Sequence, residues 1–248
     1  LRNYRLVAKR VLDLRRIGLI PWDFVVDPSR NHYSKHRWSR PADFAEVAPY
    51  FYRKDYWSKA EWRPVVLVEK DGQVAVYEQF ANSYGVDVWS CHGYGSATHL
   101  WSLAQYIKQT QQNIVILVCA DWDPSGCDWP RAAEHDLSVH LSSHRKEVVF
   151  QRVLITKDHV AALGELVALR APNERDPRVA NWLWENDYSP NDEVVVEMDA
   201  IPPKQARLEV GLVIEEIMSE EDIDLSKNSE LERQERCKIE TALSLIER

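Results

Sequence analysis

The chain has 248 residues, of which 45% are hydrophobic and 28% are charged. A chain of this size and composition can bury a substantial core, as one large or two small domains. No apolar segment approaches the length that a membrane span requires, and the first residues do not resemble a secretory signal peptide. The composition therefore excludes a membrane-spanning protein and predicts a folded one that is cytoplasmic, or nucleoid-associated if it binds DNA.

The formal net charge is −8, which argues against a nucleic-acid partner, but the charge is unevenly distributed. Residues 1–63 carry 14 Lys and Arg against 7 Asp and Glu, whereas the remaining residues carry 17 against 32. A basic module joined to an acidic domain suits an enzyme that holds a phosphate backbone with one part and metal ions with the other. The alternative is that the basic end is only a solvated surface.

The basic module begins with apolar residues at helical spacing from Tyr4 to Leu14, and the pattern ends near Gly18. A basic loop follows, and a second helix is predicted from about Pro41 to Trp62. We predict that basic side chains of this module contact DNA phosphates, with ordinary packing of an amphipathic helix as the alternative. These side chains are Arg5, Lys9, Arg10, Arg15, Arg16 and Arg37.

Aromatic residues gather near the end of the module, from Tyr50 to Trp62, among Arg and Lys residues. Aromatic rings interleaved with cations can stack unpaired bases. At helical spacing, such a set is more often a core shared by two domains, with the basic side chains reaching solvent. We favour the core interpretation.

Residues 64–205 alternate short apolar runs with helical patterns. Strands are predicted at 64–68, 86–90, 114–120 and 147–155, with helices at 74–84, 97–109 and from 126 to about 146. This alternation predicts an α/β domain with a mostly parallel sheet and right-handed crossovers. The glycine-rich turn that ends at Ser96 can present backbone amides to a phosphate, although such turns are common for steric reasons alone.

Two of the apolar runs end in acidic residues. Asp121 and Asp123 follow the third strand, and Glu69 follows the first. Residues two apart on a strand point the same way, so the two aspartates would project together from its carboxyl end, where open α/β sheets bind ligands. Adjacent carboxylates repel each other unless a cation or a proton lies between them. The pattern predicts a site for Mg²⁺, with Mn²⁺ as a substitute.

With its Glu69 and its Asp121-Trp-Asp123-Pro-Ser-Gly motif, the chain resembles the Toprim domain of topoisomerases, primases and nucleases. Within that group it looks most like the topoisomerase VI A subunit and the related meiotic double-strand-break protein. The resemblance implies a Rossmann-like Toprim fold at 64–205 and a partial winged helix at 1–63. It also implies that Glu69, Asp121 and Asp123 are catalytic metal ligands for phosphodiester chemistry on DNA. A homodimer and a separate ATPase subunit are the further partners that it implies.

A later apolar run, from Val194 to Val196, again precedes acids. It resembles the acidic strand that closes the Toprim region, so we predict that Glu197, together with Lys70 and Ser96, lies around the metal. For Asp199, capping of the helix that follows is the simpler interpretation. The last part, 206–248, has 6 basic and 12 acidic residues and is predicted to be helical, packed on the domain or on a second copy.

The sequence departs from the topoisomerase pattern in one respect. None of its early tyrosines lies in the context of the nucleophilic tyrosine of topoisomerase VI A-like proteins. Because residue 1 is Leu rather than Met, we expect the N-terminus to be incomplete, with that tyrosine upstream. Otherwise the protein uses water and is a nuclease. The alternative from another class is a non-catalytic DNA-binding or assembly protein that retains the fold.

Two further interpretations are weaker. His135, His140 and His144 share one predicted helix but have no cysteine pair to complete a zinc site. The four cysteines, Cys91, Cys119, Cys127 and Cys237, show no C-x-x-C spacing, so a zinc ribbon of the primase kind is not evident and reduced thiols are expected.

Overall fold

The computed structural model describes residues 2–21, 37–91, 97–142, 144, 146–163 and 170–244. The chain divides into two compact units, Leu1–His36 and Arg37–Arg248. Helix α1 (Arg2–Arg16) belongs to the first unit and has two arginines in its last turn. The second unit contains every other described element. The predicted division at 63/64 and 205/206 stays a prediction.

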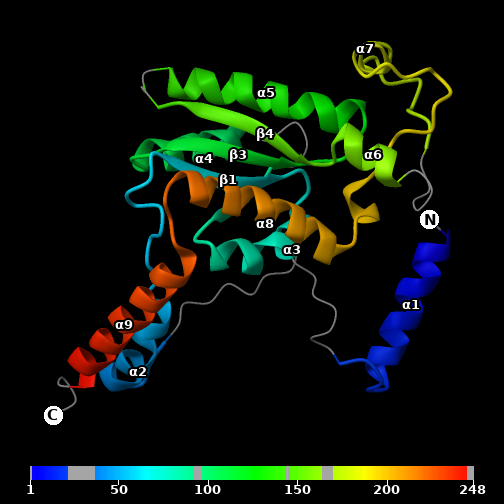
Figure 1. The fold of residues 1–248 in the computed structure, drawn as a ribbon. Helices are drawn as coiled ribbons and strands as arrows, with labels where there is room; N and C mark the ends of the chain where they lie inside the picture. Colours follow the sequence, from blue (N-terminus) through cyan, green and yellow to red (C-terminus); the bar gives the residue numbers. More distant parts are fainter. Residues whose placement is uncertain are drawn as a thin grey trace. The chain divides into compact units, whose positions relative to one another are not determined.

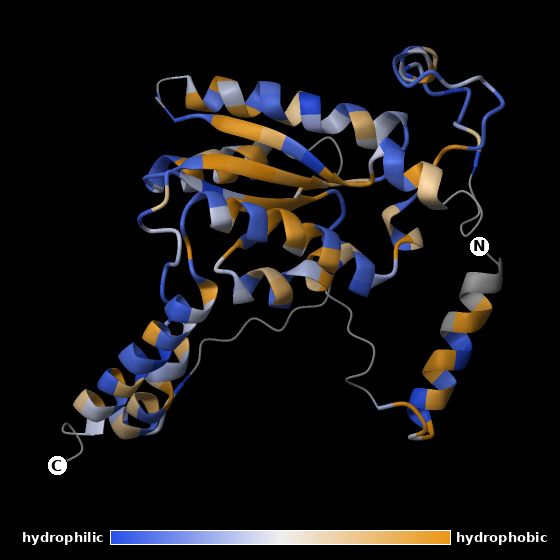
Figure 2. Cartoon of the chain, in the orientation of Figure 1, coloured by the Kyte–Doolittle hydropathy of each residue, from blue (hydrophilic) through white to orange (hydrophobic). Residues whose placement is uncertain are grey.

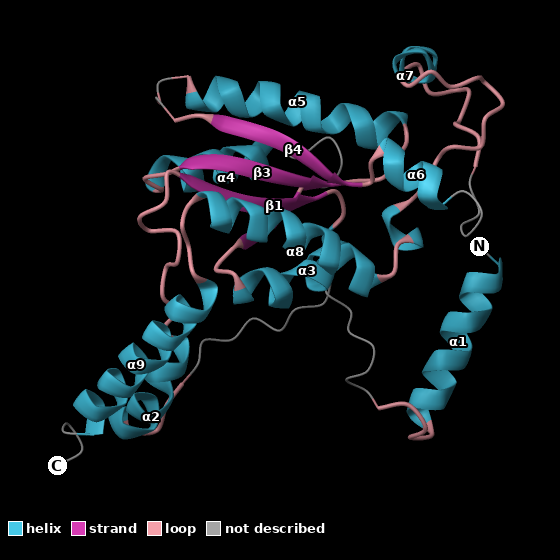
Figure 3. Cartoon of the chain, in the orientation of Figure 1, coloured by secondary structure: helices cyan, strands magenta, loops and turns pink. Residues whose placement is uncertain are grey.

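A four-stranded, all-parallel sheet is the centre of the second unit (Figures 1 and 3). The order of its strands is β2-β1-β3-β4. The strands are β1 (Trp62–Val68), β2 (Asp87–Ser90), β3 (Asn113–Cys119) and β4 (Val148–Leu154). The predicted α/β class with a parallel sheet is confirmed. Because β2 lies on one side of β1 and β3 on the other, the chain reverses its direction of winding between β1 and β3, where open α/β sheets usually bind ligands.

Helices cover both faces of the sheet (Figure 1). Side chains of α3 and α8 pack on one face, and those of α4 and α5 pack on the other. Their bounds are α3 (Asp71–Ser83), α4 (Ala97–Gln109), α5 (Pro124–Leu141) and α8 (Pro203–Glu220). Coverage of both faces explains why β1 and β3 are apolar along most of their length and stand out as hydrophobic in Figure 2.

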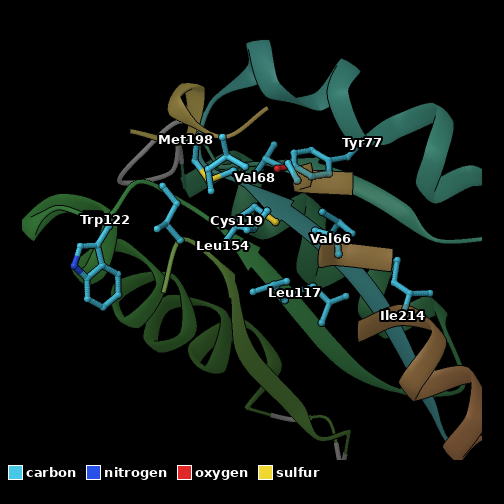
Figure 4. Close-up of a cluster of buried hydrophobic side chains, with 14 of the residues drawn as sticks. Val66, Val68, Tyr77, Leu117, Cys119, Trp122, Leu154, Met198 and Ile214 are labelled. Atoms are coloured by element: carbon cyan, nitrogen blue, oxygen red, sulfur yellow. The ribbon is translucent and has the colours of Figure 1, made fainter. Parts of the chain in front are cut away.

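The period of two along a strand divides the core into two clusters. Val66 and Val68 of β1 face the cluster that holds α3 and α8, whereas Val65 and Leu67 face the other. Figure 4 shows the first cluster, in which Tyr77 of α3 lies near the sheet residues that end β1 and β3. The same cluster includes Trp122 and Met198, so the residues that flank the predicted site are themselves part of the core.

Helix α2 (Pro41–Phe51) packs against α9 (Leu225–Ser244). The prediction of a helix from Pro41 to Trp62 is wrong in its second half, because Trp62 pairs with Asn113 as the first residue of β1. In the segment between α2 and β1, Trp57 is fully buried and donates from its indole N–H to the Tyr84 carbonyl at 2.9 Å. The core interpretation of the aromatic cluster holds for Trp57, whereas Tyr50 and Phe51 are exposed.

Two smaller predictions are corrected. Helix α5 ends at Leu141 rather than near Lys146. The apolar run Val194–Val196 is not a strand; it forms isolated antiparallel bridges with Trp122 and Arg170.

Between Arg170 and Glu197, the regular element is the short helix α7 (Val179–Glu185), as Figure 3 shows. A single turn, Met198–Ala200, then leads to α8. The remaining helix, α6 (Lys157–Leu163), follows β4.

Candidate functional site

Glu69 and Asp121 meet at the carboxyl ends of the two central strands. The Glu69 amide donates to the Cys119 carbonyl at 3.1 Å, which extends the β1–β3 pairing by one residue. The Asp121 amide in turn donates to Oε2 of Glu69 at 2.9 Å. Both side chains are buried, with Glu69 8% exposed and Asp121 5% exposed. The sheet therefore brings together two acids that are 52 positions apart in the sequence.

Asp121 is held on both sides. Its Oδ1 accepts the Met198 amide at 2.8 Å, and its Oδ2 accepts the Lys70 ammonium at 2.7 Å. Met198 reaches this position because Val196 bridges Trp122, with hydrogen bonds of 2.8 and 3.1 Å between their backbones. The segment after Val194, which the sequence predicts to lie near the metal, thus closes one side of the carboxylate site.

Asp123 has a different local role, because β3 ends at Cys119 and the two aspartates lie beyond it. Asp123 is the N-cap of α5, and its Oδ1 accepts the Gly126 amide at 2.6 Å. The two aspartates therefore follow the strand rather than belonging to it, and Asp123 starts the next helix. A β-carbon on Gly126 would lie 2.2 Å from the Asp121 carbonyl oxygen, so the Pro-Ser-Gly turn needs glycine at this position.

Arg152, on β4, supports the same turn and was not identified from the sequence. Its guanidinium donates to four backbone carbonyls: Ile155 at 2.5 Å, Gly126 at 3.0 Å, Ala120 at 3.1 Å and Asp121 at 2.5 Å. It also lies over the Trp122 ring, 5.1 Å from the ring centroid. Among the described residues, no carboxylate forms an ion pair with it. An arginine inside the strand predicted at 147–155 is the signal that could have identified it.

Burial and charge shift the pKa values of this cluster. Burial raises the pKa of Glu69; the hydrogen bond from the Asp121 amide opposes this shift, and the Asp121 and Asp123 carboxylates add to it. For Lys70, burial acts to lower the pKa, but the hydrogen bond to Asp121 and the neighbouring carboxylates raise it overall. Burial lowers the pKa of Arg152. The cluster thus combines an acid of raised pKa with two positive charges, those of Lys70 and Arg152.

An aromatic row joins this turn to α7. Trp122, Trp182 and Tyr188 follow one another with centroid separations of 6.3 and 5.5 Å. The Lys157 ammonium lies 5.3 Å from the centroid of the Tyr188 ring at the far end of the row. These contacts anchor the segment that carries α7 beside the carboxylate site.

The other residues predicted to lie around the metal or on DNA are less closely associated with the carboxylates. Glu197 pairs with Arg170 and is 43% exposed. Ser96 lies outside the described residues. Lys9, Arg10 and Arg16 are exposed, and Arg15 is half-buried, on α1, which also carries Arg5; Arg37 is exposed at the start of the second unit.

A groove of about 780 Å³ lies elsewhere in the second unit and is lined by residues of α2, α3 and α9 and by the first residues of β1 and β2. It therefore lies at the amino ends of these strands, whereas the carboxylates lie at the carboxyl ends. Two of its cations, Arg63 and Arg236, pair with Asp55 and Glu232. The sequence-predicted acids do not line it.

The donor set suits a hard divalent ion in its chemistry. Glu69, Asp121 and Asp123 offer carboxylate oxygens, and each carboxylate is oriented by a backbone amide. Magnesium needs only one or two carboxylates, with water completing its shell. Within the part of the chain that the structure describes, no group of three or more His, Cys, Asp or Glu residues is arranged to hold a metal ion. The site therefore fits a Mg²⁺ ion that is held by one or two carboxylates and by water, rather than by three protein ligands.

Models of known protein families, curated proteins and solved structures were compared with this chain, and none of them matches it. Among the described helices, none combines the length and the apolar character that crossing a membrane demands. The geometry of the carboxylate site therefore carries the functional argument.

Proposed function

We propose that this chain is a Toprim-like protein, related to the topoisomerase VI A group, that carries out Mg²⁺-dependent phosphodiester chemistry on DNA. The observation that supports the proposal most is the meeting of Glu69 and Asp121 at the ends of adjacent parallel strands. Asp123 caps the helix that begins directly after them. This is the edge of an open α/β sheet where ligands usually bind.

In this proposal Asp121 and Asp123 hold Mg²⁺, or Mn²⁺ in its place, and Glu69 lies beside it. When bound, the metal would supply Lewis-acid stabilisation of charge on the phosphate and on the leaving oxygen. Glu69 is suited to proton transfer, because its pKa is raised by burial and by the two aspartates. Since Oε2 accepts the Asp121 amide, the proton would be held on Oε1. Arg152 keeps the aspartate turn in place through its backbone carbonyls.

The nucleophile is either a tyrosine or water. Tyr52 and Tyr56 are hydrogen-bonded to Glu235 and Glu232 of α9, and Tyr50 is exposed on α2. None of these three contacts the carboxylates. We therefore expect this chain alone to release DNA ends by hydrolysis or not to cleave at all. A homodimer and a separate ATPase subunit remain part of the proposal through the resemblance alone.

Thermal melts with and without MgCl₂ test the metal site. We expect Mg²⁺ to stabilise the wild type, by about 2.7 kcal/mol at one hundred times its Kd, and not Asp121→Asn/Asp123→Asn. The matched control is Glu134→Gln/Asp136→Asn, which removes two exposed charges from α5 and should respond as the wild type does. Equal stabilisation of the wild type and the aspartate variant would show that the ion binds elsewhere.

A labelled DNA duplex tests the chemistry. After incubation with Mg²⁺ or Mn²⁺, denaturing gels separate free nicked DNA from protein-linked ends. Free ends that disappear in Asp121→Asn would support hydrolysis, whereas a protein-linked product would identify a tyrosine of this chain as the nucleophile. Binding through basic residues such as Arg10 and Arg37 should weaken as salt rises.

One observation favours a second candidate, a DNA-binding or assembly protein that does not cleave. Lys70 already neutralises Asp121, so the site is partly charge-compensated without a metal. Such a protein would bind DNA in a salt-sensitive way but would show no Mg²⁺-dependent stabilisation and no cleavage.

A further inference from the structure

The ion pair between Lys70 and Asp121 has one fixed partner and one that can move. Asp121 is 5% exposed, and its Oδ1 is anchored by the Met198 amide at 2.8 Å. The Lys70 side chain is 44% exposed, although its ammonium lies 2.7 Å from Oδ2. A lysine is a flexible four-carbon chain that ends in a strongly hydrated charge. Breaking this pair therefore means moving Lys70 into solvent while Asp121 stays in place.

The backbone of Lys70 permits this movement. Lys70 is the N-cap residue of α3, in extended conformation, and its side chain makes no capping hydrogen bond. The side chain therefore has no part in starting the helix, and it can leave Asp121 without disturbing α3.

The position of the ammonium is the one that a cation would take. It neutralises Asp121 beside two other carboxylates, Glu69 and Glu197, both of which interact electrostatically with Lys70. Asp123 adds a further negative charge near Glu69. Without a cation on Oδ2 the carboxylates of Glu69, Asp121 and Asp123 repel one another, whereas Glu197 also has Arg170 as a partner. An ammonium and a divalent ion cannot both bind that oxygen at low cost, because both are positively charged.

We propose that Lys70 is a tethered competitor of the metal: its ammonium occupies Oδ2 of Asp121 in the metal-free protein and is displaced into solvent when a divalent cation binds. This inference rests on the proposed metal site. It makes Lys70 a regulator of metal affinity, since every binding event must first break the ion pair. In the metal-free protein, the ammonium thereby offsets the repulsion between the neighbouring carboxylates.

Calorimetric titration of the full chain with MgCl₂ tests the competition. The variants are Lys70→Met and Lys70→Gln, with Lys59→Met as the control, because Lys59 is an exposed lysine of the loop that precedes β1. We expect both Lys70 variants to bind Mg²⁺ about tenfold more tightly than the wild type, a difference of about 1.4 kcal/mol. Lys59→Met should bind as the wild type does.

The outcomes separate this inference from the proposed function. Binding by the Lys70 variants but not by the wild type would support the competition and overturn the Mg²⁺-dependent function. Equal affinities in the wild type and both variants would overturn the competition and leave the function standing. No binding by any of the proteins would overturn both.

A measurement on the unaltered protein covers the case in which the variants fail to fold. The accessible ε-amines are acetylated with and without MgCl₂, and the modification of each lysine is followed by mass spectrometry. We expect Mg²⁺ to increase the modification rate of Lys70 several-fold relative to that of Lys59, because the ammonium is released from Asp121. An unchanged or reduced rate at Lys70 in protein that binds Mg²⁺ would contradict the proposal.

Discussion

Two regions of the second unit concentrate charged residues, and they hold them in different ways. At the carboxyl ends of β1 and β3, the charges of Glu69, Asp121 and Arg152 are fixed by backbone groups. Between α2 and α9, the contacts are made largely by side chains, with Glu232 accepting from Tyr56 and Arg236. Side-chain partners can rearrange, whereas backbone groups of a sheet cannot. The charges at the sheet edge are thus held more rigidly than most of those between α2 and α9.

The exposure of the acids also differs between the two regions. Glu232 is buried and additionally accepts the Lys54 amide at 3.0 Å, so it is the exception on α9. Its neighbour Glu230 is exposed, and hydrogen bonds from Arg233 and Gln234 lower its pKa to about 2. The comparison therefore predicts large effects for substitutions at the sheet edge and small ones along the outer face of α9.

The largest effect is expected for Arg152→Met. The change removes the guanidinium that donates to four carbonyls, of which Ala120 keeps the Ile155 amide, and it removes a partly buried charge, so we expect a loss of about 4 kcal/mol in the free energy of unfolding. Arg152→Lys should recover little of it, because one ammonium cannot reproduce the planar fork. Denaturant unfolding measures the loss. The control is Arg233→Met on α9, where an exposed arginine pairs with Glu230 and no measurable loss is expected. Equal losses at the two positions would contradict the difference between the two regions.

Gly126→Ala should follow, with a loss of about 3 kcal/mol. The new β-carbon would meet the Asp121 carbonyl oxygen at 2.2 Å, and both atoms belong to rigid backbone. Gly72→Ala, in the first turn of α3, is the matched control, because nothing lies within 4 Å of its β-carbon position. That change should stabilise the protein by up to about 1 kcal/mol. Thermal melts of the two variants should therefore shift in opposite directions.

Glu69→Gln should change the pH dependence of stability. The pKa of Glu69 in the folded protein is raised above its unfolded value of about 4.3, so wild-type stability falls as pH rises through the interval between them. The variant lacks this loss. Without metal we expect it to be more stable than the wild type at pH 7, with the difference shrinking below pH 4. Denaturant unfolding from pH 3.5 to 8 measures this, and a pH-independent difference would count against the argument.

The smallest effect is expected for Glu230→Gln. Glu230 is fully exposed, and its partners are an arginine and a glutamine on the same helix. Solvent and salt screen such pairs, so the melting temperature at neutral pH should not change measurably. A clear destabilisation here would mean that side-chain pairs on α9 are as firmly held as the groups at the sheet edge.

The sequence predicts the sheet well because its signals are local. The apolar runs that end at Val68 and Cys119 have the length and composition of buried strands, and both are strands in the structure. The acids after them could therefore be placed at one edge. The run Val194–Val196 has the same composition but forms only bridges, because its partners are single residues of loops rather than a strand.

The partners of the site could not be predicted, because they depend on distant parts of the chain. Arg152 contacts carbonyls near position 120, and Met198 reaches Asp121 from 77 residues away. Backbone donors and acceptors are present at every position, so no residue type identifies which of them will face a carboxylate. Similarly, the aromatic residues from Tyr50 to Trp62 have helical spacing. The segment around Trp57 is nevertheless a loop, in which Trp57 is buried and bonded to the distant Tyr84 carbonyl.

The order of strands in the sheet has a consequence for how the protein folds. Glu69 and Asp121 become neighbours only when β1 pairs with β3, and α3, β2 and α4 lie between these strands in the sequence. Closing a loop of this length costs about 3.5 kcal/mol in chain entropy before the strands contact each other. Such non-local pairing is slow compared with helix formation. The carboxylate site therefore cannot exist in a chain whose central strands are still apart, and its formation marks the moment at which they have joined.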